Sequence, residues 1–321
     1  MRRRQFLAGC AAATAWPLVA RAQARKAHTV LWVSTEAQPD PFIEGFREGM
    51  RGRGYVEGEN LAFILRYAPG DPVAVQTMLP ELLATPADLI VSSGPAILAM
   101  KAATGRPVLF AISGDPVALG IAASMARPGR NFTGFSFLSL DLAQKRVQLV
   151  REMLPTLKTL AVLSQSNHPG EASEHAATKA AADALGLQLA YAPFPSFREL
   201  DGALQRVAAS GAGAMLVYPD GVTMVNRTKI ADFARARRLP TMFGWREYCD
   251  AGGLASYGAS QRATYTRLSV YADRILRGEA PAELPIEQPT AFELVLNMRT
   301  ARALGVDIPA TLLARADDVI E

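Results

Sequence analysis

The feature of this sequence that most constrains its fold is a repeated alternation of short apolar runs with amphipathic segments. Val30–Ser34 and Val108–Ile112 are two such runs, and the segment after the first carries Ile43, Phe46 and Met50 at helical spacing. Short apolar strands that alternate with helices are typical of a parallel sheet whose two faces are both covered. The pattern therefore indicates an α/β fold.

The alternation occurs twice, with a changeover near Asn131–Ser139. After it, strands are predicted at Leu160–Leu163, Ala214–Val217 and Thr241–Phe243, with helices between them. The chain has 321 residues, which fits two domains at about 150 residues each. We therefore expect two Rossmann-like, doubly wound parallel-sheet lobes that are joined by a hinge.

The N-terminus has the composition of an export signal. A basic head (Arg2–Arg4) is followed by a weakly apolar middle and by the small-x-small site Ala20–Ala22. Arg3–Leu7 also has the arrangement of a twin-arginine signal. The uncharged stretch Phe6–Ala20 is shorter than the ~20 residues that cross a bilayer as a helix. We therefore expect export to the periplasm and cleavage before Gln23.

Removal of this leader changes the chemistry of the chain. Leu7–Cys10 resembles a lipoprotein box, but little apolar sequence precedes Cys10, so a free protein is favoured over a lipid-tethered one. The leader holds four of the 34 basic residues, so 30 basic and 30 acidic residues remain. A chain with no net charge lacks the field that nucleic-acid binding requires, and no nucleic-acid partner is expected. Cys249 is then the single cysteine, which excludes an internal disulfide.

Signatures of enzymes are missing from the sequence. It contains no P-loop, no G-x-S-x-G elbow and no S-x-x-K, and Gly211 and Gly213 precede a strand, the wrong order for dinucleotide binding. His168 and His175 enclose two glutamates at a spacing that imitates a metal site, but the favoured interpretation is a solvated helix start. We therefore expect no catalytic residue, no metal and no cofactor.

Polar residues gather where the predicted strands end. Ligands of open parallel sheets bind beyond the carboxyl ends of the strands, so these residues are the candidates for a ligand site. The candidate ligand-binding residues are Thr35, Glu36, Ser92, Ser93, Ser113, Asp115, Asn167, Tyr218, Asp220 and Trp245.

Each candidate has a role and an alternative. Helices are expected directly after Ser93 and Ser113, and their N-termini suit a ligand carboxylate. Asp115 and Asp220 are suited to pair with an ammonium group. Tyr218 and Trp245 are suited to flank an apolar or aromatic group. The alternative for each serine or aspartate is a plain helix cap, and for the tryptophan it is packing at the hinge.

Three blocks of the sequence resemble one known family. They are Asp115–Gly134, with Arg127-Pro128-Gly129 inside it, Arg246–Gly258, with Ser256-Tyr257-Gly258, and Leu284–Asp317. Together with the leader, these blocks resemble the ABC transporter substrate-binding proteins that include tryptophan- and tyrosine-type binding proteins. The resemblance covers essentially the whole chain.

The resemblance implies a type I periplasmic binding fold, with two lobes, three crossings of the chain and a ligand cleft between the lobes. It implies a signal peptide at 1–22, a first lobe of 23–137 with about 257–284, and a second lobe of 138–256 with about 285–321. It also implies a small-molecule ligand, either amino-acid-like or an aromatic carboxylate. A monomer is expected, because a carrier that closes on a hinge needs no second copy.

The expected membrane partner and two alternative functions follow from this interpretation. The resemblance implies that the protein delivers its ligand to an ABC permease in the inner membrane, which a separate ATPase drives. The first alternative is a sensor that presents the liganded form to a membrane receptor. The second is a periplasmic α/β enzyme, which the missing motifs disfavour.

Overall fold

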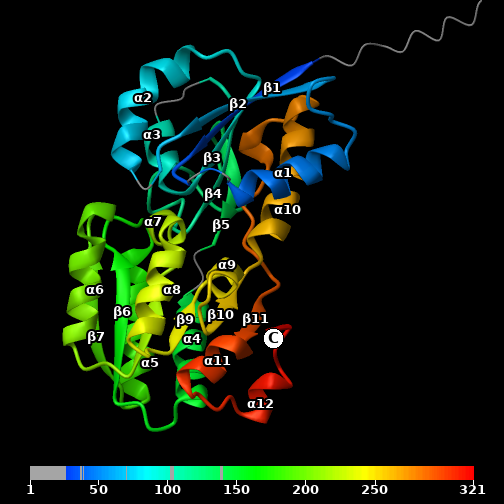
Figure 1. Cartoon of the computed structure of the whole chain (residues 1–321). Coiled ribbons are helices and arrows are strands. Elements are labelled where there is room, and N and C mark those ends of the chain that lie inside the picture. The colour runs from blue at the N-terminus through cyan, green and yellow to red at the C-terminus, as the bar shows by residue number, and fades with distance from the viewer. Residues whose placement is uncertain (1–26, 37, 39, 70, 102–104, 138–139) are drawn as a thin grey trace, which may run out of the picture.

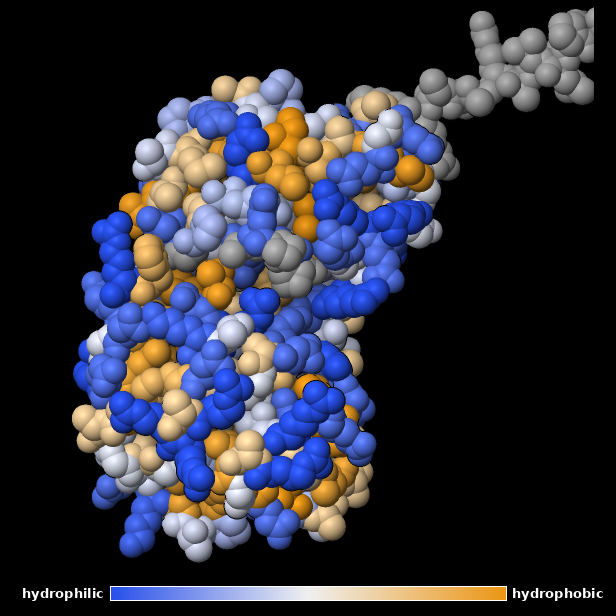
Figure 2. Space-filling model, viewed as in Figure 1, coloured by the Kyte–Doolittle hydropathy of each residue, from blue (hydrophilic) through white to orange (hydrophobic). Residues whose placement is uncertain are grey.

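The computed structural model describes residues 27–321 apart from 37, 39, 70, 102–104 and 138–139. The predicted export signal, with Cys10, lies outside the described residues. Two sheets, each with helices on its faces, lie end to end and form two lobes (Figure 1). The outline narrows between the lobes, and on the face shown in Figure 2 hydrophobic residues are scattered among hydrophilic ones.

The first sheet has the order β2-β1-β3-β4-β5, and all neighbouring strands in it are parallel. Its strands are β1 (His28–Ser34), β2 (Leu61–Tyr67), β3 (Leu89–Ser93), β4 (Val108–Ile112) and β5 (Phe132–Ser136). Its helices are α1 (Pro41–Arg51), α2 (Pro72–Ala84), α3 (Ile97–Met100) and α10 (Gln261–Leu276), with the 3-10 turns η1 (Gly94–Ala96) and η3 (Pro281–Glu283).

The second sheet has the order β12-β11-β10-β9-β8-β6-β7 and is mixed, because β10 and β11 run antiparallel. Its strands are β6 (Thr159–Gln165), β7 (Gln188–Phe194), β8 (Ala214–Val217), β9 (Thr241–Phe243), β10 (Ala255–Gly258), β11 (Glu293–Asn297) and β12 (Asp318–Ile320). Its helices are α4 (Leu140–Met153), α5 (Glu171–Ala184), α6 (Leu200–Ala209), α7 (Gly221–Val225), α8 (Arg227–Ala236), α9 (Arg246–Asp250), α11 (Met298–Leu304) and α12 (Ala310–Leu313), with η2 (Phe197–Glu199).

The chain passes between the lobes at three places: from β5 to α4, from β10 to α10, and before β11. On the last of these passages Glu287 is still held by the first sheet. Its N–H donates to the Gly134 carbonyl and its carbonyl accepts from the Ser136 N–H, both at 3.0 Å. The antiparallel pair in the second sheet follows from this route, because β11 re-enters the second lobe from the first, beside the strand that left it.

Helix starts follow the capping chemistry that the sequence contains. Asp40 and Asp71 each precede a proline and accept from backbone N–H groups of the first turn, Asp40 from Phe42 at 2.9 Å. The helix expected after Ser113 does not form. Asp115 instead caps a turn, in which its Oδ1 accepts from the Val117 N–H. The Ile121 N–H donates to the Pro116 carbonyl at 2.9 Å, and this hydrogen bond closes the turn.

The helix that returns from the second lobe packs on the first helix of the chain. In Figure 1 the orange α10 lies beside the blue α1. The contact is close at two glycines of α1: a Cβ on Gly45 would lie 2.8 Å from the Arg262 carbonyl oxygen, and one on Gly49 would lie 2.7 Å from that of Thr266. The two backbones can approach this closely because neither glycine carries a side chain.

This contact predicts the effect of adding one methyl group. We expect Gly49→Ala to lower the free energy of unfolding by about 1–3 kcal/mol, because the methyl group would press on the backbone of α10. Gly52→Ala is the matched control, since the same helix ends there in αR geometry and a Cβ would lie 3.6 Å from its nearest neighbours. Urea unfolding of both variants measures the difference, and equal stabilities would contradict the close packing of α1 on α10.

Candidate ligand-binding site

A cavity lies between the two lobes, at the carboxyl ends of their strands. Its lining comes from the segments after β1, β3, β4 and β5 and from the start of α10 on one side, and from the segments after β6, β8 and β9 on the other. The lining residues include Glu36, Phe42, Ser93, Gly94, Ser113, Phe137, His168, Asp220, Gly221, Trp245, Gln261 and Tyr265.

The lobes touch around this cavity. A Cβ on Gly221, at the start of α7, would lie 3.0 Å from Oγ1 of Thr35 and from Oε1 of Glu36. A Cβ on Gly114 would lie 2.8 Å from the Cβ of Pro169. Glycines therefore permit the close approach on both sides, and the described conformation is a closed one.

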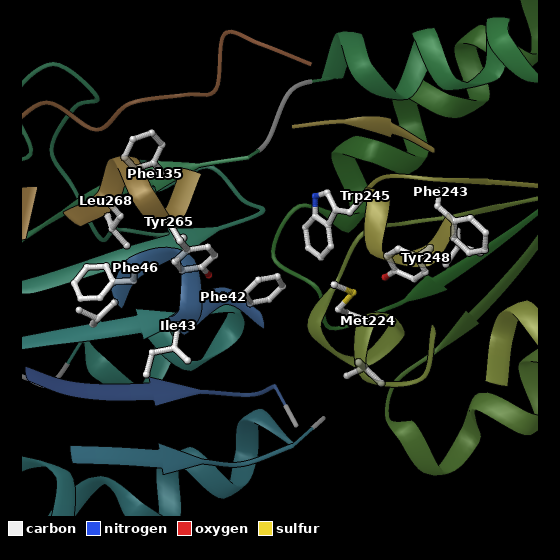
Figure 3. Packing of buried hydrophobic residues seen from close by; sticks show 14 of the residues in the cluster. Phe42, Ile43, Phe46, Phe135, Met224, Phe243, Trp245, Tyr248, Tyr265 and Leu268 are labelled. Atoms are coloured by element: carbon white, nitrogen blue, oxygen red, sulfur yellow. The ribbon is translucent and has the colours of Figure 1, made fainter. Parts of the chain in front are cut away.

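Aromatic rings from both lobes form one wall. Phe42 is stacked on Tyr265, with ring centroids 5.1 Å apart, and meets Trp245 edge-on at 6.2 Å. Phe137 also lies edge-on to Trp245, at 6.1 Å. Figure 3 shows Phe42 and Trp245 pointing toward one another from opposite lobes. The rings contact one another, and they present an apolar surface against which a flat apolar group can lie.

Two buried carboxylates face the same cavity. Asp220 is 2% exposed and caps α7, with Oδ1 accepting from the Val222 N–H at 2.7 Å and from the Thr223 N–H at 3.0 Å. Its Oδ2 is buried and has no hydrogen-bond partner among the described residues. Burial raises the pKa of Asp220 to about 6. Burial, together with Asp40 and Asp220, raises the pKa of Glu36 well above its usual range.

Hydroxyl groups of the first lobe complete the lining and its surroundings. The Ser93 hydroxyl and the Tyr265 hydroxyl are hydrogen-bonded at 2.6 Å. The buried hydroxyls of Thr35, Ser92 and Ser113 have no hydrogen-bond partner within the described ranges. Buried polar groups in native proteins are normally paired, so these hydroxyls are available to a ligand or to water.

The residues predicted from the sequence divide into three groups. Glu36, Ser93, Ser113, Asp220 and Trp245 line the cavity. Thr35 and Ser92 are buried close to it, and Tyr218 is buried in the core of the second lobe. Asp115 and Asn167 are exposed and lie outside the lining: Asp115 caps its turn, and the Asn167 amide donates to the Pro195 carbonyl at 2.9 Å.

Of the lining residues that were not among the candidates, four show what the sequence could and could not reveal. Phe42 lies in the first turn of α1, two residues after the Asp40 cap. The Asp-Pro helix start in the sequence could therefore have indicated that Phe42 lies near the carboxyl end of β1. Gln261 and Tyr265 reach the cavity only because α10 returns to the first lobe. The fourth is His168, and the solvated helix start expected there was wrong, because His168 and Glu174 are 6% and 3% exposed. Burial lowers the pKa of His168 to about 4 and keeps it neutral near pH 7.

Metal and membrane signatures are missing from the part of the chain that the structure describes. Within that part no group of three His, Cys, Asp or Glu side chains has the arrangement of a metal site. None of the helices described is long and apolar enough to span a bilayer.

Two parallel-sheet lobes that close on a polar and aromatic cavity define a solute-binding protein. The family model of the ABC transporter substrate binding proteins matches residues 30–320, and the chain belongs to this family. The fold is that of the type I periplasmic binding proteins. The family consists of binding proteins rather than enzymes.

Known relatives are similar over most of their length. A tyrosine-binding protein of Clostridioides difficile (strain R20291) is 21% identical over 270 residues, which cover 83% of this chain and 77% of the relative. A conserved domain protein from Vibrio cholerae matches with a TM-score of 0.85 and 26% identity, over 92% of this chain and 100% of the other. An ABC domain from Streptococcus pneumonia in complex with L-Trp matches with a TM-score of 0.84, the same identity and the same coverage.

The burial of Asp220 predicts a pH dependence of stability. Its pKa rises from 3.8 to about 6 on folding, so the folded protein binds this proton more tightly than the unfolded chain does. The resulting stability is present below about pH 4 and is lost as the pH rises through 6. Asp220→Asn keeps the cap and removes the charge. We therefore expect this variant to be more stable than the unliganded wild type at pH 7.5, by on the order of 2 kcal/mol.

Urea unfolding between pH 4.5 and 8 measures this difference. Asp71→Asn is the matched control, because Asp71 caps α2 in the same way, with Oδ1 accepting from Val73 and Ala74, but lies away from the cavity. A stability difference between Asp220→Asn and wild type that does not grow with pH would contradict the buried carboxylate.

Proposed function

We propose that this protein is the exported substrate-binding component of an ABC importer and that it captures an amino acid with an aromatic or bulky apolar side chain. The observation that carries the proposal is the charge of the cavity. Glu36 and Asp220 line it, and no Lys or Arg is among the lining residues that the structure describes. A site of this composition favours a ligand that brings its own positive charge.

The ammonium group is the part of the ligand that the carboxylates would bind. Burial drives both carboxyl groups toward their protonated forms, and at Glu36 the charge of Arg227 opposes this rise in pKa only in part. An ammonium group between Glu36 and Asp220 would supply a cation inside the cavity and would satisfy Oδ2 of Asp220. Of the two ligand classes that the sequence suggested, this supports the amino acid over a plain aromatic carboxylate.

The rest of the ligand would be divided between hydroxyls and rings. The Ser113 hydroxyl and the Ser93–Tyr265 pair offer donors to a carboxylate on the side of the first lobe. The apolar side chain would lie against the contacting rings of Phe42 and Trp245. The relatives that bind tyrosine and L-Trp support the same class of ligand.

Transport would follow from hinge closure. The closed form, with Gly114 and Gly221 against the opposite lobe, would be the form that an inner-membrane ABC permease accepts. The protein would reach the periplasm through its leader, by the twin-arginine route, and act there as a free monomer. We place the lobe boundaries at the changeover after β5, after Gly258 and after Glu287, close to those expected from the sequence.

The proposal predicts which parts of the ligand are required. We expect L-tyrosine or L-tryptophan to raise the melting temperature of the purified protein, whereas the corresponding deaminated acids bind at least about 30-fold more weakly, because they leave the buried carboxylates unpaired. Isothermal titration calorimetry measures both affinities. Deaminated acids that bind as tightly as the amino acids would rule out the ammonium site.

The same measurement on variants tests the residues. We expect Glu36→Gln and Asp220→Asn each to weaken amino-acid binding by about 10-fold or more, because a charge-assisted hydrogen bond becomes a neutral one. Asp71→Asn should bind like wild type. Because Asp220→Asn is expected to stabilise the unliganded protein, its weaker binding cannot be attributed to partial unfolding.

A further inference from the structure

A second cavity lies at the hinge and is lined by all three passages of the chain between the lobes. Ser136 and Phe137 come from the first passage, Ala259 from the second, and Gln288 and Pro289 from the third. Phe137 and Trp245 also line the ligand cavity, so the two cavities share these two rings as a wall. A group that binds in the hinge cavity would therefore touch both the hinge and the ligand site.

The hinge cavity contains a buried cation. Arg146, on α4, is the one Lys or Arg among its described lining residues, and its side chain is 4% exposed. Its Nε donates to the Tyr257 carbonyl at 2.8 Å. Its ion-pair partner is Glu174, whose Oε1 lies 3.8 Å from Nη1 of Arg146. That distance exceeds the ~2.8 Å of a charge-assisted hydrogen bond, so Arg146 is incompletely neutralised.

Glu174 is itself a weak counterion. Its Oε2 has no hydrogen-bond partner in the described part of the chain and lies 3.8 Å from Nδ1 of His168. Burial raises the pKa of Glu174 to about 7, although Arg146 opposes this rise and Glu171 and Asp220 add to it. Near neutral pH this carboxyl group is therefore protonated for part of the time, whereas Arg146 remains the cation of the pair although burial lowers its pKa.

We propose that the hinge cavity is a binding site for a carboxylate group, which Arg146 holds. A buried arginine with a distant and partly protonated partner binds an anion that can approach to hydrogen-bonding distance. The carboxylate has two sources: the distal end of an amino acid in the neighbouring ligand cavity, or a free small carboxylate. The first source rests on the proposed function and deepens it, whereas the second does not depend on it.

The site has a pH dependence that follows from its neighbours. The charged or titratable groups that face Glu174 are Arg146 on α4, Glu171 on its own helix, His168 after β6, and Tyr218 and Asp220 after β8. As the pH rises from 6 to 8, Glu174 ionises and competes with the bound carboxylate for Arg146. Carboxylate binding should therefore tighten as the pH falls, and Glu174→Gln should remove most of this dependence.

Calorimetry on the purified full chain distinguishes the two sources. We compare 4-carboxy-L-phenylalanine with L-phenylalanine, and separately titrate acetate and glutarate into the unliganded protein, at pH 6 and pH 8. A distal carboxylate should improve affinity at least 10-fold over L-phenylalanine. A free-carboxylate site should instead give saturable binding of acetate or glutarate alone.

Variants connect either result to Arg146. Arg146→Gln leaves Glu174 buried without its cation, so the double variant Arg146→Gln/Glu174→Gln is used to keep a foldable, neutral pair. The double variant should lose the 10-fold advantage or the free-carboxylate binding, whichever is found. Arg146→Lys should retain part of this carboxylate binding, and Glu174→Gln should strengthen it at pH 8. Arg315→Gln, which breaks a surface ion pair with Glu152, is the control.

Each outcome decides the proposal. Carboxylate binding that survives in the double variant, or no carboxylate effect in either arm, would overturn the hinge site and leave the amino-acid site untouched. Free-carboxylate binding that depends on Arg146, in a protein that binds no amino acid, would support the hinge site and overturn the proposed function instead.

Discussion

The closed arrangement of the lobes is opposed by the desolvation of two carboxylates. In the described conformation the lobes are in contact at Gly114 and Gly221, and Glu36 and Asp220 are 4% and 2% exposed. Burying an unpaired charge costs several kcal/mol, so closure without a cation requires the carboxyl groups to take up protons. A ligand ammonium would remove this cost. Ligand binding and closure would then be one linked equilibrium, because the closed form is favoured when the cation is present.

Asp220 serves the fold and the cavity at the same time. Oδ1 caps α7, and Oδ2 lies buried without a partner among the described residues. The two interpretations of this residue from the sequence, a helix cap and a ligand contact, therefore do not exclude each other, since the two oxygens of one carboxylate are available for different purposes. Asp115 carries the same sequence signature but follows a strand that ends in a turn, so its carboxylate caps the turn in an exposed position.

The sequence predicted what local chemistry decides. Strands such as β4 and β8, and the helix that starts after Asp40, follow from apolar runs and caps, and five of the candidates line the cavity because the ends of parallel strands meet at one edge. What it could not predict depends on segments far apart in the chain. Gln261 and Tyr265 line the cavity because α10 returns to the first lobe, and β11 pairs antiparallel because the chain comes back from there. The residues next to His168 and Glu174 in the sequence suggest that both are exposed to solvent. In the fold they are buried, because α4 packs over them and places Arg146 beside Glu174.

The shared wall of Phe137 and Trp245 gives the two cavities a physical connection. Phe137 belongs to the first passage between the lobes, and Trp245 meets both this ring and Phe42 of the opposite lobe. Closing the lobes therefore positions one wall of the hinge cavity, and filling the hinge cavity restrains the same two rings. A carboxylate at Arg146 that favours the closed arrangement must raise the affinity of the protein for the cleft ligand. By thermodynamic linkage, the cleft ligand must raise the affinity for that carboxylate by the same factor. The connection requires only that these two rings differ in position between the open and the closed form.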